Sequence, residues 1–368
     1  MKTTAAVLTE VGKPFEIVEL DLDGPKAGEV LVRYVAAGLC HSDLHLLKGD
    51  FPSRLPIVGG HEGAGVVEEV GPGVTKVKAG DHVLVSFIPS CGECRWCRTG
   101  RQNLCDLGEF LLDGQLPDGT FRFRLDGEDA GGMCSVGSFS QYGTLSRHSV
   151  IKIDESHPLD KAVLASCGVP TGWGTAVNAA GVTVGDTAVV YGAGGVGINA
   201  VQGAAAAGAK NVVVVDPVAL KRDTALKLGA THAFGDPDAA QEAVWEMTHG
   251  QGAEKAMVIT GDVSPEVVAQ AFNIVGKDGT IAITAMGPWE DLSIQLPAAQ
   301  LAMFQKTVKG CIFGQFNPQY DVPKLLGLYE SGLLKLDELI TREYKLEDVN
   351  QGYADLLAGE LIRGVVRF

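Results

Sequence analysis

Four cysteines that fall within fifteen residues could bind a metal ion. Their spacing is C-x2-C-x2-C-x7-C, and they are Cys91, Cys94, Cys97 and Cys105. Four thiolates hold zinc in a closed tetrahedron, which leaves no open position for water or substrate. The spacing therefore predicts a structural zinc ion in a lobe of about residues 88–108, and a catalytic metal would have to bind elsewhere.

Disulfide bonding is the alternative for this cluster. Disulfides persist in oxidising compartments, mostly in small secreted chains. The N-terminus MKTTAAVLTEVGKPFE lacks the basic and apolar segments of a secretion signal. The remaining cysteines are scattered, which favours zinc over disulfides and predicts a cytoplasmic protein. They are Cys40, Cys134, Cys167 and Cys311.

The length and charge of the chain restrict its partners. With 368 residues, the chain is long enough for two domains. Its 45 acidic and 30 basic side chains give a net charge of −15, which disfavours nucleic acid or an anionic membrane as a partner. The acidity of the chain mainly indicates solubility, and a local basic patch remains possible.

The hydrophobic patterns divide the chain into three parts. Up to about residue 153, short β-branched runs separated by glycine and proline predict a β domain. From about residue 167 to 310, apolar strands alternate with helices, which predicts a parallel sheet covered by helices on both faces. After residue 310, helices are predicted at 323–331 and 346–359, and a strand at 364–368. The pattern leaves open whether this tail rejoins the first domain.

A glycine motif at a strand-to-helix turn predicts a dinucleotide site. The strand 187–191 runs into a G-x-G-x-x-G sequence and then an alanine-rich helix. The first glycine would permit a tight turn, the second a close approach to a pyrophosphate, and the last close packing of the helix on the strand. The motif residues that we expect to bind the cofactor are Gly192, Gly194, Gly195, Val196 and Gly197.

Asp216 strengthens this prediction. It ends the next apolar strand, about 20 residues beyond the last glycine, where an acidic side chain accepts hydrogen bonds from an adenosine ribose. Its charge would repel a 2′-phosphate, so NAD is favoured over NADP. Lys221 and Arg222 on the following helix could reach a phosphate, which keeps some use of NADP possible.

Three further residues have the types of a catalytic zinc site. Cys40, His61 and Cys167 would form a Cys/His/Cys set, which leaves one position of a tetrahedral metal open. Taken singly, either cysteine could be a small buried hydrophobic residue, and the histidine could be a hydrogen-bonded turn residue. Sequence distance does not show whether the three converge.

The order of these motifs resembles that of a known family. C-H-S-D-x-H at 40–45, G-H-E-G-A-G at 60–65, the four-cysteine cluster, C-G-V-P-T-G at 167–172 and the glycine motif follow one another as in zinc-dependent medium-chain alcohol dehydrogenases. The resemblance covers essentially the whole chain. It implies an α/β protein, with a GroES-like catalytic domain at 1–168 and 313–368 and an inserted Rossmann domain at 169–312.

The resemblance also implies a mechanism. Cys40, His61 and Cys167 would hold a catalytic zinc whose open position takes the alcohol oxygen, giving two zinc ions per chain. The zinc would lower the pKa of the hydroxyl group, and a hydride would pass to the nicotinamide of NAD. Ser42 would take the hydroxyl proton and pass it through the cofactor ribose to His45, expected to be exposed enough to release it to water.

Other roles follow from the same resemblance. Glu62 matches an acid beside the zinc histidine, and Asp43 matches the carboxylate that orients that histidine. Arg363 matches an arginine that reaches the pyrophosphate, and His41 would contribute there. Thr171 matches the threonine that packs under the nicotinamide ring.

The segment 106–137 resembles the long connection of dimeric members of the family. It indicates a homodimer, with a homotetramer as the alternative. Four side chains are expected to line an apolar channel for medium-chain or aromatic primary alcohols, although core packing would explain any one of them equally well. They are Phe51, Phe87, Phe110 and Met133.

Three alternatives to this function remain. Actinobacterial NDMA-dependent nicotinoproteins, which keep NAD(H) bound and pass electrons to an external acceptor, have the same motifs. Glu109 stands where glutathione-linked formaldehyde dehydrogenases have a basic residue, which argues against glutathione but leaves another thiol adduct open. A non-catalytic nucleotide-binding protein is the remote alternative, because the predicted ligands and the proton relay are all present.

Overall fold

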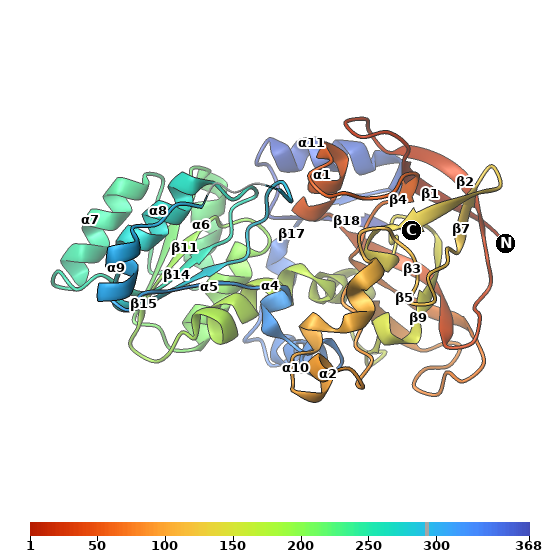
Figure 1. The fold of residues 1–368 in the computed structure, drawn as a ribbon, viewed down its shortest axis with the longest axis horizontal. Helices are drawn as coiled ribbons and strands as arrows, with labels where there is room; N and C mark the ends of the chain where they lie inside the picture. The colour runs from red at the N-terminus through yellow and green to blue at the C-terminus, as the bar shows by residue number, and fades with distance from the viewer. Residues whose placement is uncertain (291–293) are drawn as a thin grey trace. The chain divides into compact units, whose positions relative to one another are not determined.

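The computed structural model describes residues 1–290 and 294–368, and the chain forms two compact units. The first unit is made of Met1–Cys167 together with Asn317–Phe368, and the second is the continuous segment Gly168–Phe316. The chain therefore leaves the first unit, builds the second and returns to complete the first. In Figure 1 the two parts of the first unit are coloured red to yellow and blue.

A closed β-barrel forms part of the first unit. It consists of β1 (Lys2–Leu8), β2 (Glu16–Leu22), β7 (Phe123–Leu125), β8 (Glu128–Gly132) and β4 (Ile57–Val58), paired in that order. Neighbouring residues of β1 pack into two different hydrophobic clusters, with Val7 in one and Leu8 in the other. This is the alternation that the two-residue period of a strand requires.

A mixed sheet forms the rest of the β structure in this unit. Its strands, in spatial order, are β10 (Val150–Lys152), β6 (His82–Val85), β5 (Gly63–Val70), β3 (Glu29–Gly38), β18 (Arg363–Arg367) and β17 (Ile340–Tyr344), and β9 (Tyr142–Ser146) also pairs with β3. The last strand of the chain thus lies between two others, antiparallel to β3 and parallel to β17.

The longer helices of this unit are α1 (His41–Lys48), α10 (Pro318–Glu330) and α11 (Val349–Leu357), and the four-residue helices α2 (Arg95–Arg98) and α3 (Leu159–Ala162) also belong to it. The sequence patterns did not predict α1. The predicted start of α10 at Pro323 is wrong, because the helix begins at Pro318, whose missing N–H is not needed in a first turn, and Pro323 lies inside it. Figure 1 shows α1 and α11 side by side at one end of the unit.

The second unit contains a six-stranded parallel sheet. Its strands, in spatial order, are β13 (His232–Phe234), β12 (Asn211–Val215), β11 (Thr187–Tyr191), β14 (Ala253–Val258), β15 (Val275–Ile283) and β16 (Thr307–Gly310). All five strand pairs are parallel. This order, with the first strand at the centre, is that of a dinucleotide-binding sheet.

Helices cover both faces of this sheet, which confirms the predicted α/β class. Val213 on β12 packs into the hydrophobic cluster that also contains residues of α7 (Pro237–Met247) and α8 (Pro265–Ile274). The opposite face of β12 is equally buried, and Figure 1 shows α5 (Gly197–Ala206) on that side. None of the helices in the described part of the chain has the length and apolar composition needed to cross a membrane.

Candidate active site

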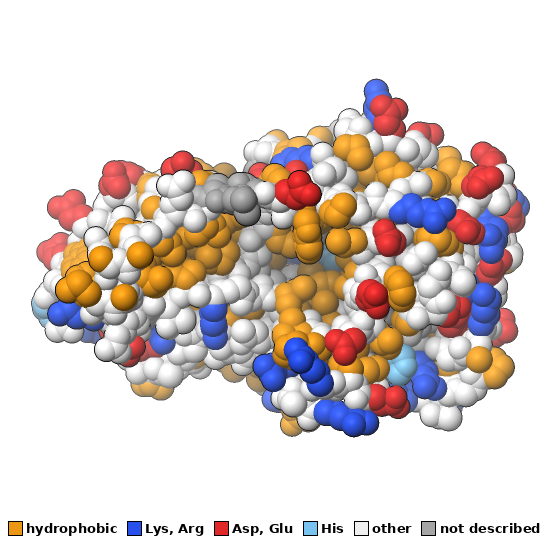
Figure 2. Space-filling view, viewed as in Figure 1, with side chains coloured by type: hydrophobic (Ala, Val, Ile, Leu, Met, Phe, Trp, Pro, Cys, Tyr) orange, Lys and Arg blue, Asp and Glu red, His pale blue; other side chains and the backbone are white. Residues whose placement is uncertain are grey.

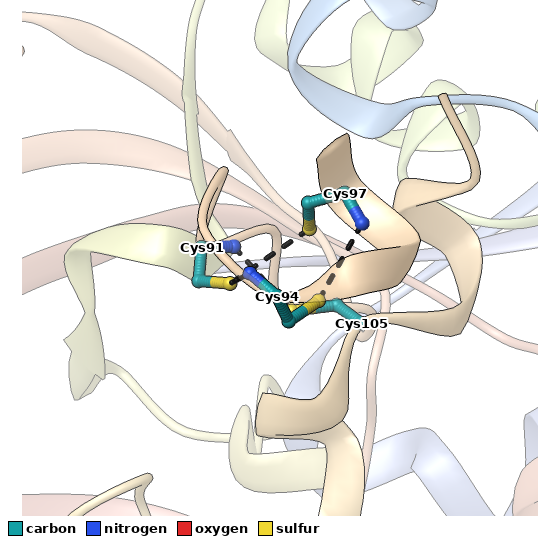
Figure 3. Close-up of side chains that lie close together, drawn as sticks. All are labelled: Cys91, Cys94, Cys97 and Cys105. Carbon is teal, nitrogen blue, oxygen red and sulfur yellow. Dashed lines mark hydrogen bonds between the residues drawn. The ribbon is translucent and has the colours of Figure 1, made fainter. Parts of the chain in front are cut away.

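The four clustered cysteines converge on one point in the first unit. Their sulfur atoms lie within 4.8 Å of one another, and Figure 3 shows the four side chains directed toward a common centre. They come from the loop around the four-residue helix α2 (Arg95–Arg98), whose N-cap is Cys94. None of the eight cysteines of the chain is in a disulfide, so this arrangement fits a tetrahedral metal site.

Backbone groups around this cluster stabilise thiolates. The Cys91 sulfur accepts N–H groups of Glu93 and Cys94, each at 3.3 Å. Burial raises the pKa of Cys94, but the backbone N–H groups of Asp106 and Cys97 lower it to about 7. Burial raises the pKa of Cys97 and Cys105 instead, so the backbone favours the thiolate form at the Cys94 side of the cluster.

A second convergence of metal-binding side chains lies in the same unit. One ligand atom each from Cys40, His61, Glu62 and Cys167 falls within 4.8 Å of the others, and all four residues are buried. Cys40 follows β3 and begins α1, His61 lies between β4 and β5, and Cys167 ends the first part of the unit. The structure thus brings together the three residues that the sequence left unconnected.

Hydrogen bonds, burial and charge shift the pKa values of the side chains in this cluster. A hydrogen bond from Cys167 lowers the pKa of Cys40 well below its usual value, against burial and with help from His61. The same hydrogen bond, together with burial, raises the pKa of Cys167. Burial lowers the pKa of His61, but the charges of Asp43 and Cys40 raise it well above its usual range.

This donor set fits a zinc ion. Both ring nitrogens of His61 are buried and have no hydrogen-bond partner among the described residues, although Nδ1 lies 3.4 Å from Asp43 Oδ2. Buried polar groups are rarely left without partners. A divalent cation bound by the sulfur atoms of Cys40 and Cys167 and by a ring nitrogen of His61 would explain two observations. It would stabilise the thiolate of Cys40, and it would give the buried ring nitrogen of His61 a partner.

Glu62 and Arg363 form a buried ion pair next to the cluster. Arg363 Nη2 bonds to Glu62 Oε2 across 301 residues of sequence. A side chain at Gly38 would overlap this carboxylate, since an added Cβ would lie 1.9 Å from Glu62 Oε2. Burial raises the pKa of Glu62 to about 7, and the charge of Arg363 opposes this. The predicted contact of Arg363 with a pyrophosphate stays a prediction.

The expectation that His45 is exposed is wrong. Its ring is 1% exposed, because α1 carries it into a cluster with the rings of His41 and Phe51, at centroid distances of 5.3 and 5.5 Å. His45 Nδ1 lies 2.7 Å from Asp50 Oδ2, and the Asp50 side chain is partly exposed. Asp50, which the sequence analysis missed, therefore connects the histidine to solvent.

The other residues predicted for the proton relay and the substrate channel differ in how close they lie to the cluster of Cys40, His61 and Cys167. Ser42 Oγ lies 3.7 Å from Cys40 Sγ. Phe87 packs edge-on against His61 with ring centroids 5.6 Å apart. Met133 is buried in a core cluster with Leu8 and Ile57, so packing accounts for it. Phe110 is half-buried at the end of a 3-10 helix (Asp106–Phe110).

The glycine motif of the second unit has the geometry expected of a dinucleotide turn. Gly192 has a φ of 88°, which disfavours any side chain. Gly197 packs so closely that an added Cβ would lie 1.8 Å from Gly192 O. Gly194 has nothing within 4 Å of that position, so its backbone has open space before it.

Asp216 fastens this turn to β12. It is buried, and its carboxylate accepts the N–H groups of Ala193 at 2.8 Å and Val218 at 2.9 Å. Arg222 donates to the backbone oxygens of Asp216 and Pro217, each at 2.8 Å. Asp216 thus has a structural role in the turn, and its predicted contact with a ribose is untested.

Thr171 lies beside the same turn. It belongs to α4 (Gly168–Gly174) and is buried. The next residue, Gly172, lets α4 approach the motif, since an added Cβ would lie 1.9 Å from Val196 O. The structure therefore positions Thr171 on the helix that contacts the glycine turn.

Comparisons with known proteins agree with this architecture. Residues 26–155 match the family model of the alcohol dehydrogenase GroES-like domain, and residues 195–331 match that of the zinc-binding dehydrogenases. The chain is 60% identical over 366 residues to a protein of Amycolatopsis methanolica named NDMA-dependent alcohol dehydrogenase, covering 100% of this chain and 99% of the relative. It is 46% identical over 370 residues to alcohol dehydrogenase B of Mycobacterium tuberculosis, with the same coverage.

Solved structures show the same similarity. A benzyl alcohol dehydrogenase from Acinetobacter calcoaceticus superposes with a TM-score of 0.92 at 31% identity, covering 100% of this chain and 99% of that one. An alcohol dehydrogenase zinc-binding domain protein from Burkholderia ambifaria gives 0.93 at 35% identity, with the same coverage. The chain therefore belongs to the zinc-dependent medium-chain alcohol dehydrogenases, a family of oxidoreductases.

Proposed function

We propose that the chain oxidises a primary alcohol to an aldehyde by hydride transfer to NAD, in a reversible reaction, with one catalytic and one structural zinc ion. The observation that carries this proposal is the buried cluster of Cys40, His61 and Cys167. It brings two thiols together with an imidazole ring whose nitrogen atoms lack a hydrogen-bond partner among the described residues. The family resemblance supports two further assignments, Met1–Cys167 with Asn317–Phe368 as the catalytic domain and Gly168–Phe316 as the nucleotide domain.

The two zinc sites would have different tasks. Cys91, Cys94, Cys97 and Cys105 would hold the structural ion. Cys40, His61 and Cys167 would hold the catalytic ion, which as a Lewis acid lowers the pKa of an alcohol hydroxyl. The carboxylate of Glu62 lies beside these ligands and forms an ion pair with Arg363. Glu62 therefore adds no net negative charge next to the two thiolates.

The residues of the second unit would bind NAD. The open backbone at Gly194 supports an approach of the pyrophosphate to the start of α5, where free N–H groups favour an anion. Asp216 supports NAD over NADP because a carboxylate at the end of β12 repels a 2′-phosphate. Lys221 and Arg222 lie on α6 (Ala219–Lys227), and residual use of NADP is the alternative.

Proton release would pass from Ser42 through His45 to Asp50. The Asp50→Asn protein is therefore expected to lose roughly tenfold or more in kcat for alcohol oxidation near neutral pH, since positioned acid–base groups contribute about 10²–10⁴-fold. Steady-state kinetics across pH, with and without imidazole as an added base, measures this loss. Imidazole should restore part of the rate.

Asp129→Asn is the matched control for this variant. Asp129 pairs with Arg124 rather than with a histidine, so its replacement should leave kcat unchanged. An Asp50→Asn protein with the kcat and pH profile of the wild type would remove Asp50 from the relay.

Aromatic side chains near the predicted relay and zinc site support a medium-chain or aromatic alcohol as the substrate. Phe51 and Phe87 lie against His45 and His61, so aromatic surface borders the relay and the metal ligand. The similar solved structure named benzyl alcohol dehydrogenase also supports an aromatic substrate. A panel of primary alcohols that varies in chain length and ring content would rank the candidates.

A second form of the reaction has support of its own. The 60% identical relative is named NDMA-dependent, which favours a nicotinoprotein that keeps NAD(H) bound and passes electrons to an external acceptor. Native mass spectrometry of the protein as purified is expected to show a retained dinucleotide on each chain in that case. A spectrum of dinucleotide-free chains, together with turnover that requires added NAD, would exclude the nicotinoprotein and leave the NAD-linked dehydrogenase.

We also propose a cytoplasmic homodimer. Within the described residues β16 pairs only with β15, and strand edges of this kind can pair with another chain. Met303, which ends α9 (Ala298–Met303) shortly before β16 in the sequence, is 78% exposed, and Figure 2 shows hydrophobic side chains gathered over α9 and β15. The free thiols support a reducing compartment. The same native spectrum distinguishes a dimer from a tetramer.

A further inference from the structure

Tyr353 carries a buried hydroxyl group that nothing in the mechanism uses. The residue lies on α11 and is 3% exposed, and its ring packs against Phe15 and Phe139 at centroid distances of 6.1 and 6.2 Å. Its hydroxyl oxygen has no hydrogen-bond partner among the residues that the structure describes. A buried hydroxyl group without a hydrogen-bond partner destabilises the folded state, so such a group usually has a role that supplies a partner.

The Asp43 carboxylate supplies the missing acceptor. Asp43 is fully buried. Its Oδ1 atom accepts the N–H of Gly60 at 3.0 Å, whereas Oδ2 lies 3.4 Å from His61 Nδ1 and has no hydrogen bond within the described residues. Leu44, the residue after Asp43, packs in the same hydrophobic cluster as Tyr353. Gly60, which donates to Asp43, lies against the Phe139 ring that Tyr353 contacts, since an added Cβ at Gly60 would lie 2.7 Å from that ring. Burial, and after it the charge of Asp43, raise the pKa of Tyr353. A buried donor and a buried acceptor, each unsatisfied, are therefore neighbours.

We propose that Tyr353 is a positioning residue of the catalytic zinc site, whose hydroxyl donates to Asp43 Oδ2 and so holds this carboxylate against His61. The inference rests on the proposed role of His61 as a zinc ligand. Partners that orient a metal-bound histidine typically change metal affinity or activity by about 10–100-fold when they are lost.

The surroundings of Tyr353 are suited to this task. Helix α11 is fastened at its start by two hydrogen bonds between Asn350 and the backbone of Phe15, at 3.0 and 2.9 Å. The ring of Tyr353 is confined by two other aromatic rings, so its hydroxyl has little freedom to turn away. Asp43 would then be held from three segments of the chain, namely its own helix, the loop at Gly60 and α11.

The test compares Tyr353→Phe with Tyr344→Phe, each of which removes one hydroxyl from the same hydrophobic cluster. Tyr344 donates to Asp355 at 2.6 Å, away from the zinc ligands, so its loss reports only on packing and stability. In Tyr353→Phe, release of the catalytic zinc to a chelator is expected to be about tenfold faster or more, and the visible bands of the cobalt(II)-substituted enzyme should shift. Tyr344→Phe should change neither.

A double-mutant cycle with Asp43→Asn sharpens the test. If Tyr353 acts through Asp43, adding Tyr353→Phe to Asp43→Asn should accelerate zinc release no further. Release rates and cobalt spectra of Tyr353→Phe that equal those of the wild type would overturn the inference, as would additive effects in the double variant. A wild-type protein that holds no zinc at Cys40, His61 and Cys167 would instead contradict the proposed function itself, so the two failures are distinguishable.

Discussion

Replacing Cys40 with alanine is expected to leave one zinc ion per chain instead of two and to reduce kcat for alcohol oxidation by at least about a thousandfold. A thousandfold loss corresponds to about 4 kcal/mol, within the several kcal/mol that a Lewis-acid metal supplies to a developing negative charge. Cys40 begins α1 and lies within 4.8 Å of the other ligand atoms, so its loss removes one of the three ligands. Metal analysis and steady-state kinetics measure the two effects.

The fold should survive this substitution. Cys40 contributes a small buried side chain, and a cysteine-to-alanine change in a packed region removes little volume. The circular dichroism spectrum should therefore match that of the wild type. Cys311→Ala is a suitable control, because Cys311 belongs to none of the groups of metal-binding residues found among the described residues. Two zinc ions per chain in Cys40→Ala, or a wild-type kcat, would refute the catalytic site.

Replacing Cys97 with alanine is expected to lower the stability of the protein strongly and to leave the activity of the folded protein unchanged. The loop that carries the four cysteines contains only a four-residue helix and a 3-10 turn (Gln102–Leu104), so little regular structure supports it without a metal. Loss of the metal should destabilise the unit by about 4 kcal/mol, an effect at the large end of single substitutions. For a unit of this size the midpoint of thermal unfolding should fall by about 10 °C.

Whether a variant loses thermal stability first or activity first distinguishes a structural from a catalytic zinc site. At a temperature where Cys97→Ala is still folded, its kcat per folded molecule should equal that of the wild type, and one zinc ion per chain should remain. Arg98→Ala changes an exposed neighbour in the same helix and should leave both the unfolding midpoint and the zinc content unchanged. An inactive Cys97→Ala protein with the thermal stability of the wild type would contradict the structural assignment.

The parts of the site that the sequence predicted are those defined by local geometry. The four cysteines lie on one short loop, so their spacing alone indicates convergence. The glycine motif likewise consists of neighbouring residues whose conformations are fixed by one turn, and Gly192 and Gly197 have the φ angle and close packing that the pattern indicates. The alternation of apolar strands and helices gave the parallel sheet of the second unit for the same reason.

The parts that the sequence did not predict depend on tertiary contacts. The burial of His45 and its contact with Asp50 require the fold of α1, an eight-residue helix with an N-cap that makes no side-chain hydrogen bond. The neighbourhood of Tyr353 and Asp43, and the ion pair of Glu62 and Arg363, join residues about 300 positions apart. No local pattern reports such contacts, and only the family resemblance could join Cys40, His61 and Cys167.

The position of β18 has a consequence for synthesis on the ribosome. This strand, Arg363–Arg367, lies between β3 and β17 and is made after every other described strand of its sheet. The second unit is continuous and can fold before β18 is made, whereas the mixed sheet of the first unit stays open until β18 has left the ribosome. A chain that ends before β18 therefore leaves β3 unpaired on that side and lacks Arg363, so its sheet is unfinished and the buried carboxylate of Glu62 has lost its ion-pair partner.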